Sequence, residues 1–198
     1  MARGNGAPVV LDIDGTLYDA TPLMAECLAR RHGIILVPAE YEDWNWWSPL
    51  LTPEELRRLI DDDFHSPEAI LSAVPYEGAV AAVSAWQAAG HPIHVVSHRS
   101  PSKDAPTLAW LSAIGLSPDV FLGGHDVDKV AYAVSVGARL VVDDHADIIR
   151  AGAAAGLLPA TIIHPYNRAT LDSLGAAAIG APDWPSLARR VAAGGALR

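Results

Sequence analysis

Short apolar runs alternate with longer helix-prone stretches along most of the chain, a pattern that leaves few folds open. The apolar runs predict strands over Val9–Ile13, Ile93–Ser97, Val120–Leu122, Leu140–Val142 and Thr161–Ile163. The stretches rich in helix formers are Ala79–Ala89, Ala105–Ile114, Lys129–Val136 and Ala146–Ala155. Continuously apolar strands separated by helices are typical of a parallel sheet that is covered on both faces. We therefore expect a doubly wound α/β fold, in which ligands bind at the carboxyl ends of the strands.

The interval after the first strand breaks this alternation. Residues 19–76 contain helical pieces and an aromatic cluster with Trp44, Trp46 and Trp47, but no convincing strand. We interpret 19–76 as a small helical cap inserted into a core formed by 1–18 and 77–198. The cap leaves the core beside the carboxyl end of the first strand, so it could cover a site there. The three tryptophans either build the core of the cap or form a stacking wall for a nucleobase, a contact worth about 1–3 kcal/mol per base.

The composition restricts the classes of partner. A formal net charge of −9 argues against a nucleic-acid polymer or an anionic membrane. The single cysteine, Cys27, cannot form an internal disulfide, and we see neither a signal peptide nor an apolar run long enough to span a bilayer. We expect a cytoplasmic protein with a small-molecule ligand, and a homodimer is compatible with the sequence.

Polar residues follow the predicted strands at the edge where ligands of such folds bind. They are Asp12 and Asp14 at the end of the first strand, Ser97, His98 and Arg99 at the end of the second, Asp143 and Asp144 after the fourth, and Lys129 at the start of a helix. Two carboxylates in one small volume repel each other unless a cation or a shared proton is present. A carboxylate nucleophile, a second carboxylate for proton transfer, acids for Mg²⁺, and a hydroxyl and an ammonium for phosphate oxygens are the groups that phosphoryl transfer requires.

The order of these motifs resembles that of the haloacid dehalogenase-like (HAD) phosphatases over nearly the whole chain. The matching stretches are Asp12-Ile13-Asp14-Gly15-Thr16, then Ser97, then Lys129, then Asp143-Asp144. The resemblance implies that Asp12 attacks phosphorus and forms an aspartyl-phosphate. It implies that Asp14 protonates the leaving oxygen and later takes a proton from water, and that Ser97 and Lys129 bind the phosphoryl group.

The same resemblance implies a Mg²⁺ site. Its ligands would be Asp12, the main-chain carbonyl of Asp14 and an acid of the Asp143-Asp144 pair, with Asp144 favoured as the direct ligand and Asp143 as its neighbour. Metal ligation would keep Asp12 ionised. The side chain of Asp14, which lies off the metal, is expected to keep a higher pKa and to act as the acid.

Within that family, the layout looks most like the 5′(3′)-deoxyribonucleotidases, which also carry a helical insert after the first motif. The stretches Pro75–Ala79 and His164–Arg168, and Trp184, match patterns of that group. Two positions depart from it: Val127 replaces a basic residue, and His98-Arg99 follow Ser97 where those enzymes have a proline. The resemblance suggests a nucleoside monophosphate as substrate. From their positions near the predicted site, Trp44, Trp46, Trp47, His98 and Arg99 are candidate substrate-binding residues.

Other functions remain open from the sequence. A phosphatase for a sugar phosphate or another small metabolite would use the same residues, and so would a transferase similar to β-phosphoglucomutase. A non-catalytic phosphate-binding module is a third alternative, although binding alone needs neither a nucleophile nor a separate acid. His98, His125 and His145 lie near the same sheet edge and raise a zinc site, but no HExxH or cysteine pairing supports it.

Overall fold

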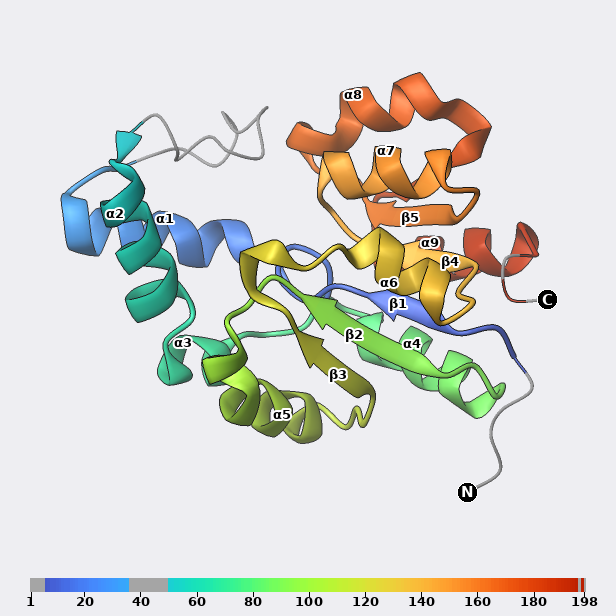
Figure 1. Cartoon of the computed structure of the whole chain (residues 1–198), viewed down its shortest axis with the longest axis horizontal. Coiled ribbons are helices and arrows are strands. Elements are labelled where there is room, and N and C mark those ends of the chain that lie inside the picture. Colours follow the sequence, from blue (N-terminus) through green and yellow to red (C-terminus); the bar gives the residue numbers. More distant parts are fainter. Residues whose placement is uncertain (1–5, 36–49, 196, 198) are drawn as a thin grey trace.

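A computed structural model of the chain describes residues 6–35, 50–195 and 197. Its centre is a sheet of six strands, all parallel, in the order β3-β2-β1-β4-β5-β6 (Figure 1). The strands are β1 (Val9–Leu11), β2 (Ile93–Ser97), β3 (Asp119–Leu122), β4 (Leu140–Val142), β5 (Leu158–Ile162) and β6 (Ile179–Ala181). This confirms the predicted doubly wound α/β fold.

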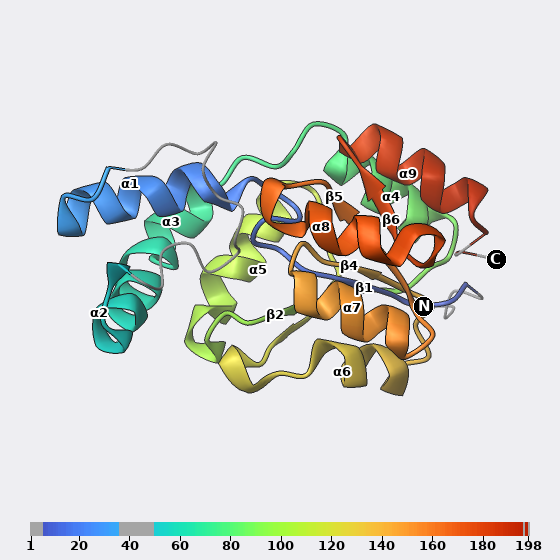
Figure 2. The ribbon, with the colours of Figure 1, turned by 90° about the horizontal axis from the view of Figure 1, so that it is seen from above.

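Helices cover both faces of the sheet, as Figure 2 shows. Alternate residues of a strand point to opposite faces, so Val9 and Leu11 belong to one hydrophobic cluster and Val10 to another. The first cluster includes residues of α4 (Ala79–Ala88), α5 (Asp104–Ala113) and α9 (Trp184–Ala193). The second includes residues of α6 (Lys129–Ser135) and residues beside α7 (Ala146–Ala154), on which α8 (Pro165–Leu174) packs. Because the central strands β1 and β4 are buried on both sides, they read as continuous apolar runs in the sequence.

The end of the sheet after β5 differs from the prediction. The apolar pattern predicts neither the helix α8 nor the edge strand β6. Strand β6 is short and its Gly180 carries no side chain, so it leaves little apolar pattern to detect. Strand β5 begins at Leu158, earlier than predicted, and it includes Pro159 in register with Val141. Proline has no N–H to donate to a neighbouring strand, which weighs against a strand when the sequence is read alone.

The segment after β1 forms a helical cap beside the sheet (Figure 1). Its described elements are α1 (Ala20–His32), α2 (Pro53–Arg58), the π-helical turn η3 (Leu59–Phe64) and α3 (Pro67–Ser72). Asp19 accepts a hydrogen bond from the N–H of Thr21 and so caps α1, and Thr52 forms a capping box with Glu55 at the start of α2. The cap has a hydrophobic core of its own, formed by Met24, Cys27, Leu28, Leu59 and Phe64.

The two connections of the cap lie side by side at the end of β1. Tyr18 and Pro75 form an isolated bridge, and the N–H of Tyr76 donates to the carbonyl of Leu17 at 2.9 Å. This pairing holds the cap next to the carboxyl ends of the strands. Short 3₁₀ turns complete the elements: η4 (Pro101–Lys103), η5 (Gly124–Asp126) and η6 (Gly175–Ala177). No described helix is both long and apolar enough to cross a membrane.

Candidate functional site

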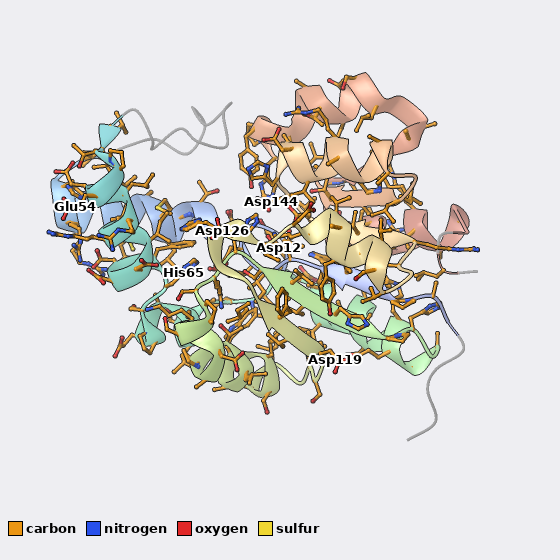
Figure 3. All side chains as sticks on the ribbon, in the orientation of Figure 1. Asp12, Glu54, His65, Asp119, Asp126 and Asp144 are labelled. Atoms are coloured by element: carbon orange, nitrogen blue, oxygen red, sulfur yellow. The ribbon has the colours of Figure 1, made fainter. Side chains whose placement is uncertain are left out.

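The predicted site residues of the core come together at the carboxyl ends of β1, β2 and β4. Strand β1 lies between β2 and β4, where successive strands are added to opposite sides of the sheet. This point in a doubly wound fold leaves a crevice in which ligands bind. Figure 3 shows Asp12 and Asp144 close together at this edge, with His65 of the cap facing them across the boundary between cap and core.

Three buried carboxylates form the centre of the site. One carboxylate oxygen from each of Asp12, Asp143 and Asp144 lies within 4.8 Å of the others. Burial raises the pKa of Asp12 to about 7, with Asp143 and Asp14 adding to the rise and Lys129 opposing it. Burial also raises the pKa of Asp144 well above its ordinary value, and the charges of Asp143 and Asp12 add to the effect. Crowded, buried carboxylate oxygens are the donor set that Mg²⁺ binds, so these residues fit a divalent cation.

Lys129 connects two of these acids. Its Nζ lies 2.9 Å from Oδ1 of Asp12 and 2.8 Å from Oδ2 of Asp143. The residue begins α6, whose N-terminus Asp128 caps, so the backbone fixes where the ammonium enters the site. Burial favours the neutral amine, but Asp12 and Asp143 raise the pKa of Lys129 above its ordinary value. Three carboxylates with one ammonium leave two formal negative charges, which one divalent cation would neutralise.

Asp144 is held from two directions. The hydroxyl of Tyr166 donates to its Oδ2 at 2.7 Å, and the side-chain amide of Asn167 donates to its main-chain carbonyl at 3.2 Å. Both residues lie on α8. On the other side, Gly15 has a φ of 78°, and a Cβ atom there would lie 2.2 Å from Oδ2 of Asp144. Only glycine therefore permits both this backbone conformation and the close approach of the carboxylate.

Asp14 lies apart from the cluster and is paired differently from the prediction. Arg99 donates from Nε to Oδ2 at 2.9 Å and from Nη2 to Oδ1 at 2.7 Å, and the hydroxyl of Tyr18 donates to Oδ1 at 2.5 Å. Nε2 of His65 lies 3.4 Å from Oδ2. Burial alone would raise the pKa of Asp14, but the charges of Arg99 and His65 outweigh it and hold that pKa well below the ordinary value. The expectation of a raised pKa for Asp14 is therefore wrong.

Arg99, predicted as a candidate substrate-binding residue, also has partners within the protein. Its side chain is fully buried, and it donates to Thr107 Oγ1 at 3.1 Å in addition to Asp14. The guanidinium is thus engaged within the protein. The adjacent His98 forms a hydrogen bond of 3.2 Å with the carbonyl of Val127 through Nε2. Ser97 is buried at the end of β2, and its hydroxyl accepts a hydrogen bond from the N–H of Arg99.

A cavity of about 120 Å³ lies above these residues, between the core and the cap. The core contributes mainly polar side chains, among them Asp12, Asp14, Ser97 and Asp144. The cap contributes Ala20, Thr21, Met24, Ile60, Phe64 and His65. Trp44, Trp46 and Trp47, expected either in the core of the cap or as a stacking wall for a base, lie outside the described residues.

Sequence reasoning missed several residues of the site. Tyr18 follows Asp14 by only four positions, so the sequence alone allows the prediction that the two lie close together. Tyr166 and Asn167 were named only within a stretch that resembles a family pattern, and their contacts with Asp144 were not predicted. No local sequence pattern indicates that His65 belongs to the site. Among the described residues, the histidines considered for zinc are not part of any metal-binding group, and the acidic trio is the group that could hold an ion.

Solved structures with the same fold include HAD-family hydrolases. No protein-family model and no curated protein matches the sequence. A HAD family hydrolase from Deinococcus radiodurans R1, solved with bound phosphate and sodium, is 21% identical with a TM-score of 0.65, over 96% of this chain and 97% of that one. A predicted phosphatase from Clostridium acetobutylicum is 15% identical with a TM-score of 0.70, over 94% and 99%. A predicted phosphoglycolate phosphatase from Haemophilus somnus 129pt is 17% identical with a TM-score of 0.66, over 96% and 99%. The chain therefore has the fold of the HAD-family hydrolases.

Proposed function

We propose that the chain is a Mg²⁺-dependent phosphomonoesterase of the HAD family that acts through an aspartyl-phosphate on Asp12. The observation that carries this proposal is the geometry of the strand ends. Asp12 shares a buried acidic cluster with Asp143 and Asp144 and contacts Lys129, while a second carboxylate, Asp14, is held separately beside it. A simple binding protein needs no such division between two neighbouring carboxylates.

The first step would transfer the phosphoryl group to the protein. A carboxylate oxygen of Asp12 forms a bond to phosphorus while the bond from phosphorus to the ester oxygen breaks, and that oxygen takes a proton from Asp14. Ser97 and Lys129 would hold the phosphoryl oxygens. Asp12, the main-chain carbonyl of Asp14 and Asp144 would hold Mg²⁺, with Asp143 beside them. A bound Mg²⁺ would supply charge neutralisation between the anionic ester and the anionic nucleophile.

The second step would return the protein to its starting state. A water molecule attacks phosphorus, the bond to Asp12 breaks, and Asp14 takes the proton of the water. The ion pair with Arg99 favours the ionised form of Asp14, which is the form this step requires. For the first step, we infer that the negative charge of the bound ester raises the pKa of Asp14 so that it can carry a proton.

The substrate would be a small phosphorylated metabolite. Similarity to structures called phosphatases supports the ester class, and the bound phosphate of the Deinococcus protein is consistent with it. A nucleoside monophosphate is a candidate on sequence resemblance alone. In the structure, Tyr166 and Asn167 of the resembling stretch contact Asp144, a role that any substrate would allow.

The test is hydrolysis of p-nitrophenyl phosphate and of a nucleoside monophosphate with and without Mg²⁺. Loss of a nucleophile should lower kcat by several orders of magnitude in Asp12→Asn. A matched control is Asp119→Asn, because this aspartate is 82% exposed at the far end of β3. Mass spectrometry of the acid-quenched protein should show one phosphoryl group in the wild type and none in Asp12→Asn. Near wild-type turnover by Asp12→Asn would refute the covalent mechanism.

A further inference from the structure

The cap side of the cavity is apolar. Met24 of α1 and Phe64 of η3 line it and also belong to the hydrophobic core of the cap, and Ala20 and Ile60 line it beside them. This surface faces the strand ends that carry the acidic cluster. When the phosphate of an ester lies at the strand ends, the leaving group of that ester would lie against this apolar surface.

His65 interrupts this apolar surface with an unsatisfied polar group. It follows the π-helical turn η3, and its N–H donates to the carbonyl of Ile60 at 2.8 Å. His65 is only 7% exposed, and within the described part of the chain its Nδ1 has no hydrogen-bond partner, while its Nε2 lies 3.4 Å from Oδ2 of Asp14, too poorly aligned for a hydrogen bond. Buried polar atoms usually have partners, because an unmade hydrogen bond costs the desolvation of the group. A ligand atom in the cavity would supply the missing partner, and π-helical turns are frequent at functional sites.

The lysine and arginine side chains near the cavity are already paired with acids, so a second anionic group would find only the lining histidines, His65, His98 and His125, as cationic partners. Arg99 is the one lysine or arginine among the described residues that line the cavity, and its Nε and Nη2 both donate to Asp14. Lys129 contacts Asp12 and Asp143, and in the proposed mechanism its remaining capacity serves the phosphoryl oxygens. An extra carboxylate on the substrate would lie among Asp12, Asp14 and Asp144 without an unpaired lysine or arginine, and burying an unpaired charge is costly. A cavity of about 120 Å³ is also small beside the ~300–1,000 Å³ typical of pockets for drug-sized ligands.

We propose that the leaving group of the substrate is a short, uncharged alcohol with an apolar segment against Met24, Ile60 and Phe64 and one hydrogen-bonding group that reaches His65. This inference rests on the proposed phosphomonoesterase function and narrows its substrate class. It predicts that esters of hydroxy acids, such as phosphoglycolate, are poor substrates, and that sugar phosphates and nucleoside monophosphates are poor as well.

The experiment compares esters of equal chain length. Propyl phosphate, 3-hydroxypropyl phosphate and the phosphate ester of 3-hydroxypropanoate differ only at the far end of the leaving group. We expect kcat/KM to be highest for the hydroxypropyl ester and at least about tenfold lower for the carboxylate, since the latter buries an unpaired charge. The hydroxypropyl ester should exceed the propyl ester about 2- to 10-fold, the ratio expected from one neutral hydrogen bond.

Two variants of the lining and one control variant assign these ratios to the cavity. His65→Phe should bring the ratio of hydroxypropyl to propyl ester close to one, whereas His91→Phe should not change it. His91 is a matched control because it is buried to the same extent, and its Nδ1 already has a partner in the carbonyl of Ala7. Thr21→Lys adds a cation to the lining and should raise the relative kcat/KM of the carboxylate ester. Ratios within one variant cancel any loss of folded protein.

The outcomes separate this inference from the function on which it rests. Hydrolysis of p-nitrophenyl phosphate with a preference for the carboxylate ester, a sugar phosphate or a nucleotide would overturn the inference alone. An unchanged ratio in His65→Phe would remove His65 from substrate recognition. Failure to hydrolyse any phosphate monoester would overturn the proposed function and this inference with it.

Discussion

Replacing Arg99 by methionine should destabilise the protein because it leaves Asp14 without its main partner. The guanidinium makes two hydrogen bonds to Asp14, and the two side chains are 0% and 19% exposed. Breaking a buried ion pair by removing one partner costs about 3–5 kcal/mol. Because Asp14 keeps some exposure and the hydrogen bond from Tyr18, we expect the lower end, about 3 kcal/mol. At roughly 2–4 °C per kcal/mol for a chain of this size, the melting temperature should fall by roughly 6–12 °C.

A double-mutant cycle tests whether this loss comes from the ion pair. Asp14→Asn alone leaves Arg99 buried without a counter-charge, so it should also be destabilising, whereas Asp14→Asn with Arg99→Met removes both charges. The double variant should therefore be more stable than the sum of the single losses predicts, by about 1–3 kcal/mol. Urea unfolding gives the free energies, and Arg58→Met is a matched control because its pair with Glu54 is 58% and 64% exposed. An exposed pair contributes about 0–1 kcal/mol.

The same variant has a catalytic consequence. If Arg99 orients Asp14 as the proton donor, Arg99→Met should lower kcat more for an alkyl phosphate than for p-nitrophenyl phosphate, whose leaving group departs without a proton. General acid catalysis contributes about 10²–10⁴-fold, which limits the size of the difference. Additive free energies in the cycle, or equal loss of kcat on both esters, would refute the positioning of Asp14 by Arg99.

Three further predictions concern the metal site. A cation binds the ionised form of Asp12, and burial raises the pKa of this carboxyl to about 7. Mg²⁺ affinity should therefore rise with pH and be about a hundredfold weaker at pH 5 than above pH 8. A Mg²⁺-induced thermal shift of equal size from pH 5 to pH 8 would contradict this. Tyr166→Phe removes the hydrogen bond to Asp144 and should weaken Mg²⁺ binding about 10–100-fold, as measured by calorimetry, whereas unchanged binding would mean that the tyrosine does not orient the ligand. Gly15→Ala places a Cβ 2.2 Å from Oδ2 of Asp144 at a φ of 78°, so it should weaken Mg²⁺ binding and lower the melting temperature together; a protein with wild-type values of both would show that the backbone there relaxes freely.

The sequence alone determined the sheet and the position of the site. Apolar runs such as Ile93–Ser97 and Leu140–Val142 have the length of strands, and the helices between them force the strands to be parallel. Parallel strands end at the same edge, so Asp12, Ser97 and Asp143 had to come together once the strands were recognised. These conclusions need only local periodicity and one rule of topology, and the structure agrees with them.

The tertiary structure alone decided the electrostatics of the site and the nature of its cavity. The pairing of Asp14 with Arg99 spans 85 positions in the sequence, and the approach of His65 to Asp14 requires the cap to dock on the core. No local pattern predicts either contact, because each depends on where separate elements pack. The raised pKa expected for Asp14 was wrong for this reason: its value is set by which charge lies beside it, and that charge comes from the next strand of the sheet.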